Sequence, residues 1–379
     1  MPRFLEPCAE VVVNKFSLET RFKLTQSLPY LKSLYLNLKS VEFGENEVEI
    51  NGTLHKMGVY REYPEGVPIP EEHRDDNARG GTSKDLGEDG ARIWNTTFLP
   101  GDVALIPRDM WGDGRSEPPE EKPQFQRLLQ YTIRKKNGDE QIERFVYNKS
   151  LHEAFKYLTI KLFGGSTYSI AVKNFTIKWG LRVLPLPVGV SFVVENLKLG
   201  SCRYLASSPL VKMFTQNRIA QIIDVDFGRG NVGIREDFAF FELCRTVVLR
   251  DYQDEEGRLA NIMKLKNPEI IILNPTKRFS NQFVEIIRDR TKNCPLIGQK
   301  FTLEHIHDGY VAHVLNKIEA EFKSKPAVNT SLFLDIENEP DLHLKVSCTS
   351  GHWQTWRLSE RVTIEAKKKS RKRMMDLYE

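Results

Sequence analysis

The sequence predicts an α/β fold in which short parallel strands alternate with helices. In the C-terminal half of the 379-residue chain, an apolar strand followed by a helix of one to three turns recurs roughly every 24 to 31 residues. A unit of this length cannot bury its own apolar face, so neighbouring units must stack into a shared core. Parallel strands joined by helical crossovers then form either a leucine-rich-repeat-like array or an open α/β sheet. The six expected strands are Asn196–Gly200, Ile219–Phe227, Thr246–Arg250, Glu269–Leu273, Lys300–Ile306 and Ser331–Ile336.

The N-terminal part is expected to contain helices first and β-hairpins afterwards. Residues 1–40 read as a short helical region in which Ser17 caps one segment and Pro29 begins another. From residue 41 the apolar period changes to two, which is typical of strands. Asn51-Gly52 predicts a hairpin turn into a strand over residues 53–60.

The rest of the region 41–180 is predicted to hold loops, a second hairpin and one helix. Residues 61–123 contain eight of the 19 prolines and many glycines, so we expect long loops without regular elements there. Asn137-Gly138 marks the turn of a hairpin over residues 126–147. A helix over Lys149–Phe163 and a strand over Ser169–Ile177 follow.

The repeat region is expected to span residues 181–347 and to end in a basic tail over 348–379. Strand alternation predicts that Leu303 and Leu334 are buried on adjacent strands while Glu304 and Asp335 face outward. The stretch Lys367–Arg373 contains six basic residues in seven, which is typical either of a nuclear import signal or of a solvated tail.

Composition limits the function classes. The chain has 55 basic and 51 acidic residues, so its net charge of +4 favours neither nucleic acid nor an anionic membrane as a partner. Five scattered cysteines without a CxxC spacing indicate unpaired thiols in a reducing compartment rather than a zinc cage. We find neither a secretory signal nor an apolar run of about 20 residues, so we expect a cytoplasmic or nuclear protein that does not cross a membrane.

One motif suggests a cofactor. Gly228–Gly233 follows an apolar strand, precedes a predicted helix over Arg235–Cys244 and is followed by Asp251 at the end of the next strand, which formally fits a dinucleotide fingerprint. The short helix and the acids in Arg235-Glu236-Asp237 argue instead for a glycine-dependent turn. A nucleotide-binding α/β enzyme is therefore kept as the alternative function.

The other polar clusters have structural explanations. His305, His307 and His313 with Asp308 could hold a metal, but Asp308 is better explained as the N-cap of a helix over Gly309–Phe322. Asp224 and Asp226 alternate with Ile223 and Val225, so they are expected on the polar side of their strand. No catalytic, cofactor-binding or metal-ligating residue is assigned, and no cofactor is expected.

Several stretches resemble a protein family. Lys56–Pro64, Asn77–Gly81, Leu162–Gly165, Leu186–Phe192 and His307–Ala312 are similar to segments of a nematode-expanded, F-box-associated type of protein that carries a domain of unknown function.

The resemblance implies a function. In such proteins an F-box recruits the Skp1-type adaptor of a ubiquitin ligase, and the C-terminal region is thought to bind substrates. Here residues 16–38 resemble a shortened, divergent F-box. We therefore expect a non-enzymatic protein-binding module, and the resemblance implies one form of it, an F-box-type substrate receptor of a ubiquitin ligase.

Overall fold

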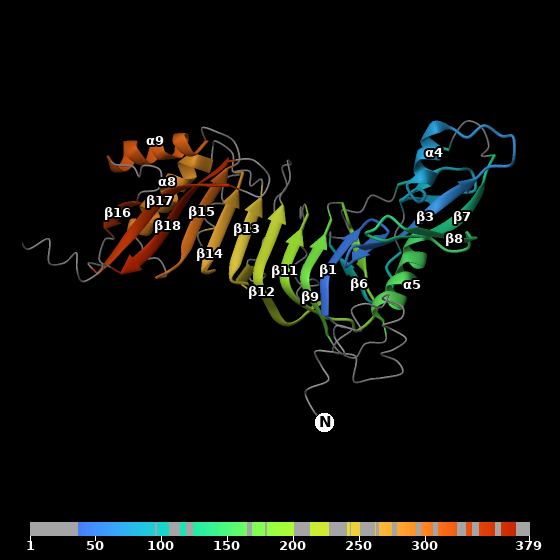
Figure 1. The fold of residues 1–379 in the computed structure, drawn as a ribbon, viewed down its shortest axis with the longest axis horizontal. Coiled ribbons are helices and arrows are strands. Elements are labelled where there is room, and N and C mark those ends of the chain that lie inside the picture. The colour runs from blue at the N-terminus through green and yellow to red at the C-terminus, as the bar shows by residue number, and fades with distance from the viewer. Residues whose placement is uncertain are drawn as a thin grey trace, which may run out of the picture. The chain divides into compact units, whose positions relative to one another are not determined.

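The computed structural model, whose helices and strands are labelled in Figure 1, divides into two compact units, residues 1–197 with 204–218, and residues 198–203 with 219–379. It describes residues 37–94, 97–105, 114–118, 124–164, 169–178, 180–200, 213–226, 241–242, 244–250, 262, 265–274, 279–292, 297–305, 310–323, 331–335, 341–352 and 358–368. The predicted helical region therefore lies outside the described residues up to residue 36, and residues 37–40 belong to a strand.

The first unit is built on an antiparallel meander, as the alternating pattern predicts. Its strand order is β11-β9-β1-β2-β3-β7-β8, in which β1 also pairs in parallel with β9. The strand bounds are β1 Asn37–Gly44, β2 Glu47–Ile50, β3 Thr53–Glu62, β7 Gln126–Arg134, β8 Glu140–Val146, β9 Ile170–Ile177 and β11 Phe192–Leu199.

Residues with positive φ close the predicted hairpins. Asn51 (φ 52°) and Gly52 (φ 85°) form the turn between β2 and β3, and Gly138 (φ 92°) lies in the turn between β7 and β8. The Asn51 side chain also fixes the first turn, because its Oδ1 accepts hydrogen bonds from the backbone N–H groups of Lys39 (2.8 Å) and Ser40 (3.1 Å). Both hairpin predictions are confirmed.

The region 61–123 contains regular elements where only loops were expected. The helix α4 (Glu71–Ala78) and the short strands β4 (Asp85–Leu86), β5 (Arg92–Ile93) and β6 (Asp102–Ala104) lie within it. A partly buried ion pair joins Arg61 Nη1 and Asp76 Oδ2 at 3.0 Å, and the Asn77 side-chain amide hydrogen-bonds to both the N–H and the carbonyl of Arg61. The proline and glycine content did not predict these elements, because the segment is ordered by side-chain contacts with β3.

A helix completes the described part of the first unit. The helix α5 (Leu151–Phe163) begins with a capping box, in which Ser150 Oγ accepts from Glu153 N–H and the Glu153 carboxylate accepts from Ser150 N–H. Nearby, β10 (Val183–Pro185) pairs with β6. The rings of Phe43, Phe163, Phe175 and Phe192 contact one another in the core, with centroids 5.1 to 5.9 Å apart.

The second unit contains the predicted parallel strands. Its order is β16-β17-β18-β15-β14-β13-β12, with β12 to β15 parallel and β15, β18, β17 and β16 antiparallel. The bounds are β12 Phe214–Asp226, β13 Thr246–Arg250, β14 Glu269–Leu273, β15 Lys300–His305, β16 Ser331–Asp335, β17 Leu342–His352 and β18 Leu358–Lys368. The α/β class is confirmed, and β12 to β15 follow the order that the repeat predicts.

Two expectations about the C-terminal part differ from the structure. Strands β17 and β18 separate β16 from β15, so Leu303 and Leu334 do not lie on adjacent strands. Residues 348–352 and 358–368, expected in a basic tail, belong to β17 and β18. The alternation Val362, Ile364, Ala366 against Arg361, Thr363, Glu365 is the strand signal hidden by the basic run that follows it.

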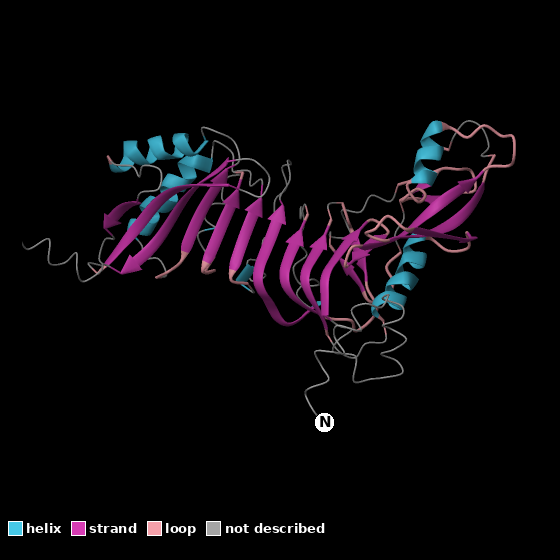
Figure 2. Ribbon diagram, viewed as in Figure 1, coloured by secondary structure: helices cyan, strands magenta, loops and turns pink. Residues whose placement is uncertain are grey.

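One face of the second unit's sheet carries two continuous apolar rows. Two rows of side chains that lie opposite one another across six strands are exposed by 3% or less. They are Ile223, Val247, Ile270, Phe301, Ile364 and Val346 in one row and Val225, Leu249, Ile272, Leu303, Val362 and Cys348 in the other. Helices α8 (Phe279–Lys292) and α9 (Tyr310–Phe322) lie on one side of the strands (Figure 2). The guanidinium carbon of Arg290 in α8 lies 5.3 Å from the Phe301 ring centroid, so α8 covers the apolar face.

Side-chain amides close the end at which the parallel strands begin. Asn267, just before β14, donates to the carbonyls of Phe241 (2.6 Å) and Cys244 (2.7 Å), which precede β13. Gln299, just before β15, donates to the carbonyls of Leu265 and Asn267, both at 2.9 Å. Each amide thus satisfies buried carbonyls next to the neighbouring strand, a recurring device that links consecutive units.

Two buried thiols agree with the expected unpaired cysteines. Cys244 and Cys348 are free, and burial raises the pKa of the Cys244 thiol to about 12. The other cysteines lie outside the described residues. None of the helices that the structure describes has the length and apolar character needed to span a membrane.

We predict that Asn267→Ala lowers the free energy of unfolding by about 1–3 kcal/mol, because the buried Cys244 carbonyl loses the amide donor and the Phe241 carbonyl keeps only longer bonds from Cys244, at 3.4 Å. Denaturant unfolding measures this change. Asn148→Ala, at an exposed position before α5, is the matched control and should leave stability nearly unchanged. Equal changes in the free energy of unfolding for Asn267→Ala and Asn148→Ala would show that the Asn267 hydrogen bonds do not contribute to stability.

Candidate functional site

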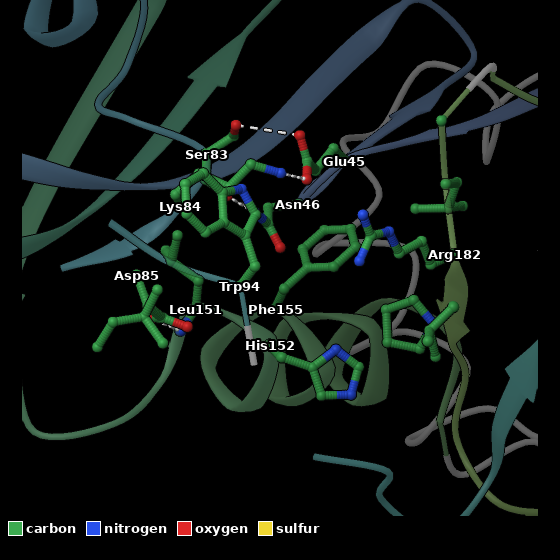
Figure 3. A pocket seen from close by; sticks show the side chains of 15 residues that line it. Glu45, Asn46, Ser83, Lys84, Asp85, Trp94, Leu151, His152, Phe155 and Arg182 are labelled. Carbon is green, nitrogen blue, oxygen red and sulfur yellow. Dashed lines mark hydrogen bonds and ion pairs between the residues drawn. The ribbon is translucent and has the colours of Figure 1, made fainter. Parts of the chain in front are cut away.

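A small pocket in the first unit lies between α5, the β1–β2 turn and the segment before β10 (Figure 3). It encloses a cavity of about 80 Å³. Its lining includes Glu45, Asn46, Lys84, Trp94, His152, Phe155 and Arg182. The Arg182 guanidinium is exposed and makes no hydrogen bond or ion pair with the described residues, whereas Lys84 is paired with Glu45.

A buried charge cluster supports the floor of this pocket. The fully buried Asp102 side chain contacts His152 Nε2 through Oδ2 and Lys156 Nζ through Oδ1, each at 2.6 Å. Burial opposes ionisation of Asp102, but the hydrogen bonds from His152, Lys156 and the backbone of Leu99 hold its pKa below the ordinary value. Lys156 also donates to the carbonyl of Leu186.

A second carboxylate anchors the start of α5. Asp85 accepts hydrogen bonds from the Tyr147 hydroxyl (2.5 Å) and from the backbone N–H of Leu151 (2.7 Å). Burial raises the pKa of Asp85, and burial together with Asp85 raises the pKa of Tyr147. The carboxylates of Asp85 and Asp102 therefore both hydrogen-bond to neighbouring groups of the protein. His152 and Lys156 are already bound to Asp102. The pocket can hold a small polar group beside Arg182, but its acids and bases are arranged as a structural clamp.

The second unit offers a larger candidate surface, the side of its sheet opposite the apolar rows. We call it the polar face and define it by alternate residues of the strands. One row contains Thr246, Glu269, Lys300, Glu365 and Lys345, each opposite the next. A second row contains Arg250, Leu273, Glu304 and Arg361. Asp224, on the same side of β12, belongs to the polar face as well, as the sequence predicts.

The carboxylates of the polar face have partners within it. Asp224 makes a bidentate contact with Arg250 at 2.6 and 2.7 Å. Glu304 pairs with Arg361 (2.9 Å), and Glu365 pairs with Lys367 (3.1 Å). Glu269 accepts from the Thr246 hydroxyl at 3.0 Å.

Two lysines of the polar face, unlike most of its carboxylates, have no charged partner among the described residues. Lys300 is exposed and Lys345 is half-buried. Neither forms an ion pair with a residue that the structure describes.

Glu304 corrects one expectation about this face. It does point away from Leu303, as strand alternation requires, but it is 3% exposed instead of solvated. Glu304 is buried because it pairs with Arg361 on β18. The residues of β18 were expected in the basic tail. Asp335 is exposed and Leu334 is half-buried on β16.

The other motifs that the sequence analysis weighed fall mainly outside the described residues. Gly228–Gly233 and Asp251 are among them, so the nucleotide-binding alternative stays a prediction. Within the residues that the structure describes, no group of three side chains could hold a metal ion. His313 is exposed on α9, whereas His307 and Asp308 are not described. Of the basic stretch 367–373, the structure describes Lys367 and Lys368, at the end of β18.

Sequence reasoning missed the cluster of Asp102, His152 and Lys156. His152 and Lys156 are four residues apart on α5, so their shared face was visible in the sequence. Asp102 lies some 50 residues earlier in a proline- and glycine-rich segment, and no local pattern connects it with the helix.

Comparison with known proteins identifies one domain. Residues 150–307 match the family model of a domain of unknown function, DUF3557. No curated protein and no solved structure matches the chain. The expected domain of unknown function is therefore confirmed, while the F-box-associated and nematode relationship stays a prediction.

We predict that Asp102→Asn lowers the free energy of unfolding by about 3–5 kcal/mol, since Lys156 would remain buried without its counter-charge. The folded-state pKa of Asp102 is depressed, so its contribution is present above about pH 4 and is lost as the pH falls through the lower folded pKa.

Thermal and denaturant unfolding at several pH values test this assignment. Glu117→Gln, at an exposed site, should leave the unfolding midpoint nearly unchanged. A stable Asp102→Asn variant with wild-type acid sensitivity would contradict the clamp.

Proposed function

We propose that the chain is a non-enzymatic protein-binding module and that the polar face of the second unit is its recognition surface. The observation that carries this proposal is the difference between the two faces of one sheet. The apolar rows are buried to 3% exposure or less. The polar face is only partly buried: Thr246, Val248, Leu273, Thr302 and Glu304 are exposed by 8% or less. The charged side chains of Lys300, Lys345, Arg250 and Arg361 on the same face remain partly exposed.

The charges of the polar face favour an acidic protein segment as partner. Its carboxylates are held by Arg250, Arg361, Lys367 and the Thr246 hydroxyl. Lys300 and Lys345 stand opposite Glu365 from both sides without an ion pair among the described residues. An acidic segment lying across the strands would pair with these two lysines, and rim charges of this kind determine specificity and association rate.

The finer parts of the proposal rest on the strand order, on the amide bonds and on the sequence. The regular spacing of β12 to β15 and the linked amides of Asn267 and Gln299 support a leucine-rich-repeat-like arrangement limited to these parallel strands. Residues 16–38 resemble a divergent F-box, which supports a substrate receptor that recruits a Skp1-type adaptor. In that case the acidic partner is a ubiquitin-ligase substrate.

Affinity purification with quantitative mass spectrometry tests the proposal. We predict that the combined change Lys300→Glu and Lys345→Glu lowers recovery of the specific partner at least tenfold, because it places acids against an acidic segment. The partner that is lost should carry such a segment. Ubiquitin-ligase components should remain bound to the variant if the receptor role is correct.

Lys317→Glu is the matched control, because Lys317 is an exposed lysine of the same unit on α9. It should retain the partner. Unchanged recovery with the double variant, or equal loss with the control, would contradict a recognition role for the polar face.

A further inference from the structure

The strand β8 forms an open edge of the first unit's sheet. It is the terminal strand in the order and pairs only with β7 among the described strands. All seven of its residues are exposed, including three large apolar side chains, Ile142 (47%), Phe145 (48%) and Val146 (69%). An exposed edge with apolar side chains is a template for pairing with another strand.

The charges beside Ile142 are held in place by the neighbouring strands. The guanidinium carbon of Arg144 lies 3.7 Å from the Tyr60 ring centroid, and its Nε donates to Gln130 Oε1 at 3.0 Å. Glu140 uses Oε1 to accept from Arg134. The terminal nitrogens of Arg144 and Oε2 of Glu140 form no bond with the described residues, so both groups can make another contact.

Symmetry limits how two such edges can pair. A twofold axis perpendicular to the sheet places the same residue of both copies on the same face, so directly opposed residues must both be even- or both odd-numbered. An axis at Glu143 would place Glu143 opposite Glu143 of the second copy. An axis at Arg144 would place Arg144 opposite Arg144 of the second copy. An axis at Gln141 would oppose Asp139 to Glu143. All three registers place like charges together.

An axis at Ile142 gives a complementary register. Ile142 then meets Ile142 of the second copy, and Glu140 meets Arg144 on both sides of it. All of these side chains lie on one face of the strand because they are even-numbered. The apolar pair lies at the centre with opposite charges beside it, as a self-complementary interface requires.

We propose that the β8 edge binds a second copy of this chain in the antiparallel register centred on Ile142. This site belongs to the first unit and does not depend on the recognition role of the polar face. A homodimer through β8 also explains why the exposed Ile142 has Glu140 and Arg144 on its two sides along the same face of the strand.

Charge reversal in the full-length chain tests the register. Glu140→Arg alone would oppose two arginines on each side of the axis, and Arg144→Glu alone would oppose two glutamates. Each variant should therefore raise the dimer dissociation constant at least tenfold over wild type in light scattering coupled to size exclusion. An equimolar mixture of the two variants restores both opposite-charge pairs and should form a heterodimer.

The folded state of each variant is checked by circular dichroism and thermal unfolding. A third variant, Ile142→Lys, keeps both charges and should prevent dimerisation by opposing two lysines. A wild-type chain that is monomeric at every soluble concentration would overturn the proposal. So would a dimer that persists in both single variants, or variants that stay monomeric when mixed.

Discussion

Strand alternation in the second unit decides which of its surfaces is available for binding. Two rows of residues from β12, β13, β14, β15, β18 and β17 are apolar throughout, and the next residues along the strands are mostly polar. The apolar rows must be covered, and α8 lies over Phe301 on that side. Since a one-residue slip would exchange the two faces, the register fixes the packing of the core and the chemistry of the polar face together.

The polar face is then shaped by contacts between strands. The bidentate Asp224–Arg250 pair and the Glu304–Arg361 pair fix their side chains across neighbouring or diagonal positions. These contacts satisfy the carboxylates, whereas Lys300 and Lys345 form no ion pair with the described residues, which is why we propose them as the contacts for a partner. The buried cluster around Asp102 in the first unit has the opposite character, because its charges are used internally to hold α5. For this reason the polar face, rather than the pocket, is the better candidate for recognition.

Local patterns predicted the elements whose signals are local. Asn51-Gly52 and Asn137-Gly138 identified two turns, in which Asn51, Gly52 and Gly138 have positive φ. Short apolar runs identified β13 and β14 with their observed bounds. Contacts between distant segments were not visible. The helix α4 depends on the Arg61–Asp76 pair, Asp102 meets α5 across some 50 residues, and Glu304 is buried because β18 returns beside β15. Composition alone suggested loops or a tail in these places.

Cross-linking of the purified complex with a carbodiimide, which joins carboxylates directly to lysine amines, measures the central claim most directly. The account predicts that acidic residues of the partner become linked to Lys300 and Lys345. Lys317, an exposed lysine on α9, should remain unlinked and serves as an internal reference. Links to Lys317 or to the first unit, with none to Lys300 or Lys345, would contradict the assignment of the polar face as the recognition surface.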